Sequence, residues 1–404
     1  MTTDAQVIIV GAGPAGSMAA YQLASKGISV LILEKAIFPR YKVCGAGLTH
    51  KILQQIPFDI SPILETHVTT IIFSRGFKDT FQRQSVEPLL YCTNRDKLDD
   101  FLLQKAVQAG ARVLHGEQVM KVSQNTDNVT VTTKDNTYRS NLLIGAEGAA
   151  GHVARLAGLH ENIEQGLAWE AEITADPETV KTFSNTVFLD WGSFPGGYGW
   201  VFPKGDHFSI GVGGPASLSK WMMPYYKKML AYLASERSKI EVLETMSLKS
   251  WPIPVRIKKG RFHNGRILVA GDAAGLTDPL TGEGIYYAVR SGILAGDISA
   301  HYMQGIVKTL DSYSAAVNGE LMEELLEANR IKHVFNTVPA RIHHFVRDSD
   351  RAWKAFNKIL RGERLYVDVR NGFSRWKLFW GAICKFSYWM SEEKERVFRK
   401  RGFK

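Results

Sequence analysis

A glycine motif near the N-terminus constrains the fold of this chain more than any other feature of the sequence. Gly11-x-Gly13-x-x-Gly16 follows the apolar segment 6–10 and opens a helical pattern. A second apolar run, 28–33, comes directly after that pattern. The order of strand, glycine turn, helix and strand predicts a βαβ unit at the start of a parallel sheet.

Each glycine of the motif has its own physical role. Gly11 permits a tight turn, Gly13 lets the backbone approach a pyrophosphate, and Gly16 allows close packing of helix and strand. The start of the helix presents free N–H groups and partial positive charge to phosphates. Glu34, which ends the second run, can accept the ribose hydroxyls of an adenosine. The set predicts a dinucleotide site and leaves FAD and NAD open.

A second glycine turn favours FAD. The buried run 266–270 leads into Gly271-Asp272, and a helix begins near Gly284 and Ile285. Asp272 can hydrogen-bond a ribityl hydroxyl. The positive end of the helix can stabilise the N1–C2=O side of a reduced flavin.

These motifs resemble the FAD-dependent aromatic hydroxylase superfamily over most of residues 1–300. An intermediate turn, Gly145-Ala146-Glu147-Gly148, belongs to the same resemblance. That superfamily usually has Asp in place of Glu147, which puts a direct hydrogen bond from this turn in doubt. The implied fold class is α/β and α+β, with a Rossmann-type FAD-binding domain interleaved with an antiparallel-sheet substrate domain, followed by C-terminal helices.

The length of 404 residues allows two or three domains. With 45% hydrophobic residues the chain is not intrinsically disordered. We expect the FAD-binding domain in 1–60, 93–160 and 255–315, the substrate domain in 61–92 and 161–254, and the helical region in 316–404.

Two further segments resemble the geranylgeranyl reductase family. The run 42–48 carries Lys-x-Cys-Gly-x-Gly-Leu, and the run 198–204, followed by Gly211 and Gly213, matches Tyr-x-Trp-x-Phe-Pro-Lys…Gly-x-Gly. In that family the aromatic motif lines a tunnel that holds a polyprenyl chain beside the flavin. The resemblance therefore implies a substrate tunnel lined by Tyr198, Trp200, Phe202 and Pro203.

Alternation alone places Tyr198, Trp200 and Phe202 on one face of a strand. Three aromatic side chains on one face fit an isoprenoid chain. They also fit an ordinary core face, which aromatic strands commonly form. Only the resemblance favours the tunnel.

The resemblance also places Cys44, Gly45 and Gly47 at the flavin ring. Basic neighbours favour a thiolate at Cys44, which we single out as a candidate catalytic acid. A small residue that fills a tight loop explains Cys44 equally well.

The resemblance further places Arg95 at the pyrophosphate and the backbone of Val119 at the adenine. Arg95 can instead form an ion pair with Asp99, four residues later on the same helix. The complete set of predicted FAD-binding residues is Gly11, Gly13, Ala15, Gly16, Glu34, Cys44, Gly45, Gly47, Arg95, Val119, Asp272, Gly284 and Ile285.

Neither a disulfide framework nor a metal site is predicted. The three cysteines are widely spaced, and adjacent His343 and His344 point about 100° apart on a helix. No basic-plus-apolar leader precedes the first strand and no run of about 18 apolar residues occurs, so we expect a cytoplasmic protein.

The net charge of +10 arises in the last 54 residues, which hold 15 Lys/Arg and 5 Asp/Glu. A helical face there is apolar and aromatic, with members Trp376, Phe379, Trp380, Ile383, Phe386 and Met390. We expect a further helix to start at Ser391. Peripheral membrane contact and packing on the protein both fit this pattern. Nucleic-acid binding does not, because the aromatic residues form one apolar face.

The sequence thus predicts an FAD-dependent reductase that saturates isolated C=C bonds of a geranylgeranyl or polyprenyl chain by hydride transfer from reduced flavin N5. The chain could be a free diphosphate or linked to a lipid, a chlorophyll or a quinone. The electron donor, NADPH or reduced ferredoxin, stays open. The alternatives are a flavin monooxygenase acting on an apolar substrate, and a prenyl-binding escort protein of the same fold without flavin. The intact glycine motifs argue against the latter.

Overall fold

The computed structural model describes residues 3–235, 242–245, 248–372 and 377–402, with the backbone alone at 242–245, 372 and 377–380. Contacts between Cα atoms divide the chain into two compact units. Unit 1 comprises 1–42, 95–164 and 253–326, and unit 2 comprises 43–94, 165–252 and 327–404. The chain therefore crosses from one unit to the other five times.

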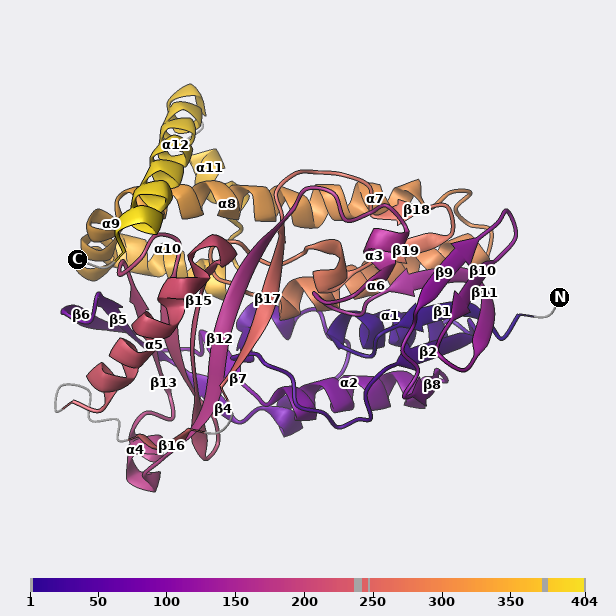
Figure 1. Ribbon diagram of the computed structural model, residues 1–404, viewed down its shortest axis with the longest axis horizontal. Coiled ribbons are helices and arrows are strands. Elements are labelled where there is room, and N and C mark those ends of the chain that lie inside the picture. Colours follow the sequence, from indigo (N-terminus) through magenta and orange to yellow (C-terminus); the bar gives the residue numbers. More distant parts are fainter. Residues whose placement is uncertain (1–2, 236–241, 246–247, 373–376, 403–404) are drawn as a thin grey trace. The chain divides into compact units, whose positions relative to one another are not determined.

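Unit 1 is built on a mainly parallel sheet with the strand order β18-β19-β11-β1-β2-β8 (Figure 1). The added strands β10 and β9 extend the sheet from β11 in antiparallel fashion. The predicted βαβ start is confirmed, because β1 and β2 pair in parallel on either side of a helix. The strands are β1 (Ala5–Val10), β2 (Val30–Glu34), β8 (Arg112–His115), β9 (Lys121–Gln124), β10 (Val129–Thr132), β11 (Thr137–Gly145), β18 (His263–Asn264) and β19 (Ile267–Val269).

Small residues bring two helices of unit 1 into close contact. A Cβ atom on Gly292 of α6 would lie 2.2 Å from the Ala15 carbonyl oxygen of α1, and one on Gly296 would lie 2.8 Å from that of Ala19. Any side chain at these glycines would push the helices apart. The helices are α1 (Pro14–Ala24), α2 (Arg95–Gln108), α3 (Val153–Leu156), α6 (Ile285–Met303) and α7 (Asp311–Ala316), with a 3₁₀ turn at Gly271–Ala274 and a π turn at Val317–Leu321.

Unit 2 contains a larger sheet with the order β16-β12-β15-β14-β13-β5-β6, to which β17 adds beside β12. The sheet is antiparallel apart from β13 and β5, which pair in parallel. A small sheet, β3-β7-β4, accompanies it. The strands are β3 (Gly47–Thr49), β4 (Thr66–Val68), β5 (Thr70–Arg75), β6 (Asp79–Gln84), β7 (Leu90–Cys92), β12 (Ile163–Ala175), β13 (Thr186–Trp191), β14 (Tyr198–Pro203), β15 (His207–Pro215), β16 (Val242–Thr245) and β17 (Lys249–Arg256).

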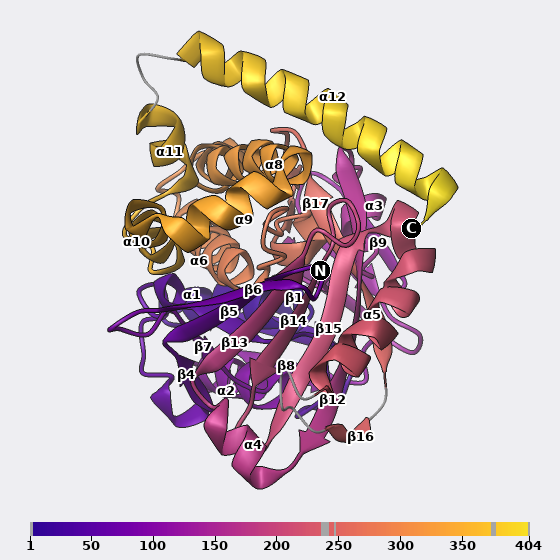
Figure 2. The same ribbon diagram turned by 90° about the vertical axis from the view of Figure 1, so that its left-hand side faces the viewer.

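Helices cover both faces of this sheet. One face packs on α5 (Figure 2), and a second core joins Phe73 and Trp191 of the sheet to Phe335, Trp353 and Phe356 of the C-terminal helices. The helices are α4 (Pro177–Thr182), α5 (Ser219–Leu233), α8 (Met322–Thr337), α9 (Pro339–Asp348), α10 (Asp350–Leu360), α11 (Tyr366–Gly372) and α12 (Lys377–Arg401), and 3₁₀ turns cover His50–Ile52, Ser61–Ile63 and Ala216–Leu218.

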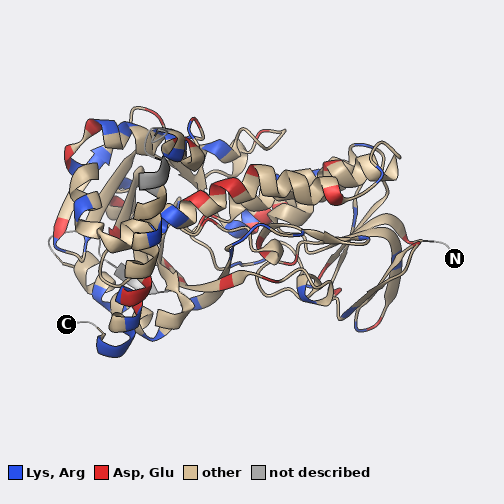
Figure 3. Ribbon diagram, turned by 90° about the horizontal axis from the view of Figure 1, so that it is seen from above, with Lys and Arg blue, Asp and Glu red and all other residues tan. Residues whose placement is uncertain are grey.

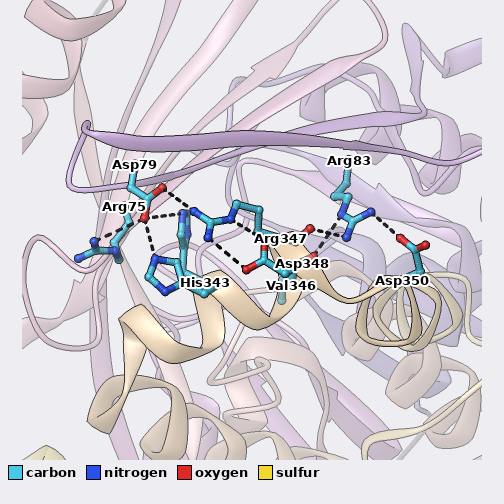
Figure 4. Close-up of polar contacts among 9 residues, drawn as sticks. Arg75, Asp79, Arg83, His343, Val346, Arg347, Asp348 and Asp350 are labelled. Atoms are coloured by element: carbon cyan, nitrogen blue, oxygen red, sulfur yellow. Dashed lines mark hydrogen bonds and ion pairs between the residues drawn. The ribbon is translucent and has the colours of Figure 1, made fainter.

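Ion pairs fasten the β5–β6 hairpin to α9 (Figure 4). Asp79 lies 3.1 Å from His344 Nε2, 3.3 Å from Arg347 Nη1 and 3.5 Å from Arg75 Nη2. Burial raises the pKa of Asp79, but the hydrogen bond from His344 and the nearby positive charges lower it overall. The carboxylate therefore holds the hairpin against the helix as a charged group.

The predicted domain boundaries differ from the two units by a few residues at most boundaries and more widely in two segments. Residues 43–60 lie in unit 2, because β3 pairs with β7 of that unit. The region 316–404 is not a separate domain, since its first residues, up to Leu326, belong to unit 1.

The expected helix start at Ser391 is wrong. A single helix, α12, runs from Lys377 to Arg401, and Ser391 is a buried position within it. Two successive acidic residues, Glu392 and Glu393, resemble a helix start in sequence, yet no Gly or Pro interrupts the helix there.

Candidate active site

The glycine turn of unit 1 leaves an open space above the start of α1. Gly11 has a φ angle of +96°, and a Cβ atom there would lie 2.5 Å from the Ala146 carbonyl oxygen. A Cβ atom on Gly16 would lie 1.9 Å from the Gly11 carbonyl oxygen. A Cβ atom on Gly13, in contrast, would have only Arg40 Nη2 near it, at 4.0 Å. The backbone at Gly13 is therefore accessible to a phosphate group.

Glu34 lies at the end of β2 beside this turn. Its Oε2 accepts a hydrogen bond from the Ala12 N–H at 2.7 Å, and its Oε1 accepts one from the Ala36 N–H at 2.9 Å. Each carboxylate oxygen keeps capacity for a second donor, such as a ribose hydroxyl. The backbone N–H of Glu117 bonds to the Glu34 carbonyl, and buried Val119 follows two residues later.

Two arginines converge on one buried carboxylate close to the glycine turn. Arg95 forms a bidentate pair with Asp99, with both N···O distances at 2.8 Å. Arg40 Nη2 lies 3.1 Å from the same carboxylate. Arg40 Nη1 is buried and has no hydrogen-bond partner among the described residues. An arginine with an unmatched donor beside an open glycine turn fits a pyrophosphate.

The second glycine turn brings Asp272, Gly284 and the start of α6 together. A Cβ atom on Gly284 would lie 3.2 Å from Asp272 Oδ1, and Thr277 Oγ1 donates to the same oxygen at 3.4 Å. Ile285 is the first residue of the 19-residue helix α6. On the other side of the turn, a Cβ atom on Gly271 would lie 3.0 Å from that of Ala15. The second glycine turn therefore lies beside the starts of both α1 and α6.

Glu147 has a structural role in the intermediate turn. Its Oε1 accepts hydrogen bonds from the N–H groups of His152 and Val153, which cap α3. Burial raises the pKa of Glu147 despite these bonds.

In unit 2, the loop that carries Cys44, Gly45 and Gly47 packs on the aromatic residues of β14. A Cβ atom on Gly45 would lie 2.7 Å from Phe202 Cδ2 and 3.0 Å from Trp200 Nε1. The glycine therefore permits direct contact between backbone and rings. The motif at 42–48 and the motif at 198–204, far apart in the chain, therefore pack directly against each other.

The predicted common face of β14 is confirmed. The ring centroids of Tyr198 and Trp200 lie 5.6 Å apart, and those of Trp200 and Phe202 lie 6.3 Å apart. Opposite them on β15, a Cβ atom on Gly211 would lie 2.2 Å from Trp200 Cζ2, so the indole lies over this glycine. The indole N–H is buried, with no hydrogen-bond partner among the described residues.

Lys204, the last residue of the aromatic motif, fastens the loop to β14. Its side chain is fully buried, and its Nζ donates to the carbonyl oxygens of Gly45 at 2.7 Å and Thr93 at 2.5 Å. The Thr93 N–H in turn donates to the Ala46 carbonyl at 3.2 Å. Pro203, also buried, precedes the lysine.

The cysteines differ in environment. Cys44 is partly exposed, and its Sγ accepts a hydrogen bond from the Ala46 N–H at 3.4 Å. Cys92 is fully buried, and burial raises the pKa of its thiol although the charge of Lys204 lowers it. Burial also raises the pKa of Cys384, to about 11. Only Cys44 has the exposure that a reactive thiol needs.

Comparison with known proteins identifies the family. Residues 4–319 match a family model described as an FAD binding domain. An uncharacterised protein of Methanosarcina barkeri is 34% identical over 305 residues, which cover 74% of this chain and 76% of that protein. A digeranylgeranylglycerophospholipid reductase of Methanococcoides burtonii is 30% identical over 351 residues, 83% of this chain and 85% of that protein. The chain belongs to the geranylgeranyl reductase family. It is an FAD-dependent oxidoreductase that acts on CH–CH groups.

A solved structure shows the same fold. The crystal structure of a geranylgeranyl bacteriochlorophyll reductase-like protein from Thermoplasma acidophilum superposes with a TM-score of 0.74 at 22% identity. The match covers 92% of this chain and 98% of that protein. The predicted aromatic-hydroxylase-like fold is thereby confirmed.

Two residues of the site were missed as functional candidates from the sequence. Lys204 ends the aromatic motif and Arg40 lies two positions before the run 42–48, but nothing in the sequence shows what each side chain faces. Arg40 could have been suspected, because it follows the second strand and Glu34 in a loop near the dinucleotide. A lysine after a buried aromatic strand carries no such signal.

Metal binding has no support in the described parts of the chain. No group of three or more His, Cys, Asp or Glu side chains there is arranged to hold an ion. His343 and His344 do face a common carboxylate, Asp79, but Arg75 and Arg347 share it. In the same residues, no helix is both long and apolar enough to cross a membrane.

Proposed function

We propose that this protein saturates isolated C=C bonds of a geranylgeranyl or longer polyprenyl chain. The observation that carries the proposal is the contact between the Gly45 loop and the rings of Trp200 and Phe202. It joins the segment that the family resemblance assigns to the flavin with an apolar aromatic face. The name of the Methanococcoides burtonii relative supports a chain linked to a glycerophospholipid. A free diphosphate, a chlorophyll and a quinone are the other candidate carriers.

The residues of unit 1 fit the nucleotide part of FAD. We propose that the N–H groups at Gly13, Ala15 and Gly16, with Arg40, bind the pyrophosphate, and that Glu34 binds the adenosine ribose. Arg95 then acts through Asp99, which holds Arg40 in place.

The remaining predicted residues fit the other parts of the cofactor. Val119 would contact the adenine, Asp272 a ribityl hydroxyl, and Gly284 and Ile285 the N1–C2=O side of the flavin. Cys44, Gly45 and Gly47 would contact the flavin ring. When bound, FAD supplies the hydride for the reaction.

The chain's own contribution is to exclude water and orient the alkene. Tyr198 and Phe202 are four residues apart, so their strand presents about 13 Å of aromatic face. An isolated alkene offers no polar group to bind, so contact with these rings must hold it in position. A dry wall also protects the reduced cofactor from side reactions.

Cys44 stays a candidate acid for the second hydrogen. The change Cys44→Ala tests that role, since full turnover with FAD retained would remove the thiol from the chemistry. NADPH and reduced ferredoxin are both candidate electron donors.

We also propose peripheral contact with a lipid surface through α12. Among the side chains described there, Phe386, Tyr388 and Trp389 are 59%, 51% and 61% exposed. Lys and Arg gather on the last turns of the helix, beside the C-terminus (Figure 3). Of the predicted apolar face, Trp376 lies outside the described residues, as do the side chains of Phe379 and Trp380.

An anaerobic experiment separates the reductase from the flavin monooxygenase. Dithionite-reduced protein should be reoxidised by a prenyl compound without oxygen. Reoxidation that occurs only with oxygen, coupled to an oxygenated product, would support the monooxygenase. A colourless purified protein would support the escort protein.

A further inference from the structure

A buried carboxyl group lies on the aromatic face of the unit 2 sheet. Glu170 of β12 pairs with Gly211 of β15, and Gly211 pairs with Trp200 of β14. Directly paired residues point to the same side of a sheet. Glu170 therefore shares the face of Tyr198, Trp200 and Phe202, and it is fully buried.

The Trp200 indole lies between the row that contains Glu170 and the Gly45 loop. The ring lies over Gly211, and its Nε1 would lie 3.0 Å from a Cβ atom on Gly45. Glu170 occupies the next strand of the same row. Trp200, Gly211 and Glu170 thus form one row of paired residues across three strands. A substrate chain lying on the aromatic face would run beside the Glu170 carboxyl.

Polar residues lead from Glu170 to the protein surface. Ser209 Oγ donates to Glu170 Oε1 at 2.9 Å, and Ser209 pairs directly with Glu172 across the strands. Glu172 Oε2 lies 3.0 Å from His207 Nε2, and His207 Nδ1 lies 2.6 Å from Asp206, whose side chain is 93% exposed. The pairs Glu170–Ser209, Glu172–His207 and His207–Asp206 are each within hydrogen-bond distance. Ser209 and Glu172 are related only by their direct pairing across the strands.

Two titratable neighbours respond to these carboxylates. Burial alone would lower the pKa of His207, but its bonds to Glu172 and Asp206 raise it. Burial raises the pKa of Tyr226 on α5, and the charge of Glu170 raises it further. His207 is thus suited to carry a proton inward from solvent near neutral pH.

We propose that Glu170 donates the proton that completes alkene reduction, an inference that rests on the proposed function. The hydride forms a C–H bond at one alkene carbon, and the π electrons form the second C–H bond with the proton of the Glu170 carboxyl. Bound reduced FAD would supply the hydride with its two electrons, the alkene would be reduced, and Glu170 would be left as carboxylate. Solvent returns the proton through His207, Glu172 and Ser209.

Acid strength favours Glu170 over Cys44 in this role. An ordinary glutamic acid has a pKa of about 4.3, against about 8.5 for a thiol. An isolated alkene is a weak base and needs a strong acid. The proposed role requires the buried Glu170 carboxyl to be protonated before the hydride is transferred.

The test compares Glu170→Gln with a matched control, Asp190→Asn. Asp190 is a buried carboxyl on the opposite face of the same sheet, where its Oδ2 accepts a hydrogen bond from Tyr225. Glu170→Gln should bind FAD normally and be reduced by dithionite. Its anaerobic reoxidation by geranylgeranyl diphosphate or a geranylgeranyl lipid should slow on the order of 100-fold, and that of Asp190→Asn only a few-fold.

A spectroscopic readout does not depend on turnover. The infrared spectrum of the wild-type holoprotein should contain a protonated carboxyl band that Glu170→Gln lacks and Asp190→Asn keeps. If Glu170→Gln does not fold, Ser209→Ala should slow repeated turnovers while leaving the first within a few-fold. Unchanged repeated turnover would contradict the relay.

The outcomes distinguish the inference from the function on which it rests. Wild-type rates in Glu170→Gln, with active wild-type protein, overturn the inference and leave the reductase standing. If no prenyl compound reoxidises the wild-type protein, the proposed function fails, and the inference fails with it.

Discussion

Arg40 shows how a single side chain adapts a common glycine turn to a charged ligand. Its Nη2 is paired with Asp99, while its Nη1 is buried without a partner among the described residues. An unsatisfied buried donor costs free energy unless a ligand supplies the acceptor. We therefore expect FAD binding to recover that cost.

The change Arg40→Ala should weaken FAD binding by about 10- to 150-fold, since a charge-assisted hydrogen bond contributes about 1.5–3 kcal/mol. Equilibrium dialysis of the apoprotein with FAD measures this directly. The control is Arg112→Ala, at an exposed position of unit 1. Equal affinity of Arg40→Ala and wild type would remove Arg40 from the site.

Gly45 tests the contact between loop and aromatic face. Gly45→Ala should lower the free energy of unfolding by about 1–3 kcal/mol, because its Cβ would overlap Phe202. Phe202→Ala in the same chain should relieve most of that loss. Chemical denaturation measures both, with Gly381→Ala as control, where no heavy atom lies within 4 Å. Additive losses in the double variant would show that the contact is not the cause.

At the scale of elements, Asp190 makes the unit 2 sheet sensitive to pH. Burial raises the pKa of Asp190 to about 6, although hydrogen bonds from Tyr225 and Phe77 lower it. The folded state therefore binds this proton more tightly than the unfolded state, whose pKa is about 3.8. The resulting stability is full below about pH 4 and is lost as the pH rises through 6.

Asp190→Asn removes this titration. The free energy of unfolding of the wild type, relative to that of the variant, should fall by up to about 3 kcal/mol between pH 4 and 8. Denaturation series at several pH values measure the difference. A difference that is constant with pH, or that grows toward pH 8, would contradict the raised pKa.

The helix α12 is the element proposed to contact lipid. Phe386→Ser with Trp389→Ser should reduce cosedimentation with anionic vesicles more than tenfold, because each buried aromatic contributes about 1.5–3 kcal/mol. Ile306→Ser, at another exposed apolar position, serves as control. Vesicle binding that survives the double change would place the contact elsewhere.

The sequence predicts local elements well where a short pattern decides them. The glycine motif predicted β1, α1 and β2, and alternation predicted the common face of Tyr198, Trp200 and Phe202. The parallel pairing of β13 with β5 was not predicted, since the strands are more than 100 residues apart in sequence. The burial of Lys204 and Glu170 was missed for the same reason: long-range pairing determines what a side chain faces.

At the scale of the molecule, the predicted site residues are distributed over both units. The predicted nucleotide-binding residues belong to unit 1, whereas Cys44, Gly45, Gly47 and the aromatic face belong to unit 2. Only three residues separate Arg40 from Cys44, so the chain connects the two sets directly. Neither unit carries the complete set, and we expect the reaction to need the whole chain.

The most direct test of this account is a single anaerobic turnover followed by mass spectrometry. The dithionite-reduced holoprotein is mixed with a geranylgeranyl lipid, and flavin reoxidation is measured together with the mass of the product. A geranylgeranyl reductase should yield a product heavier by two hydrogens for each flavin reoxidised. A flavin that stays reduced with every prenyl compound, or a product that appears only with oxygen and carries it, would contradict the account.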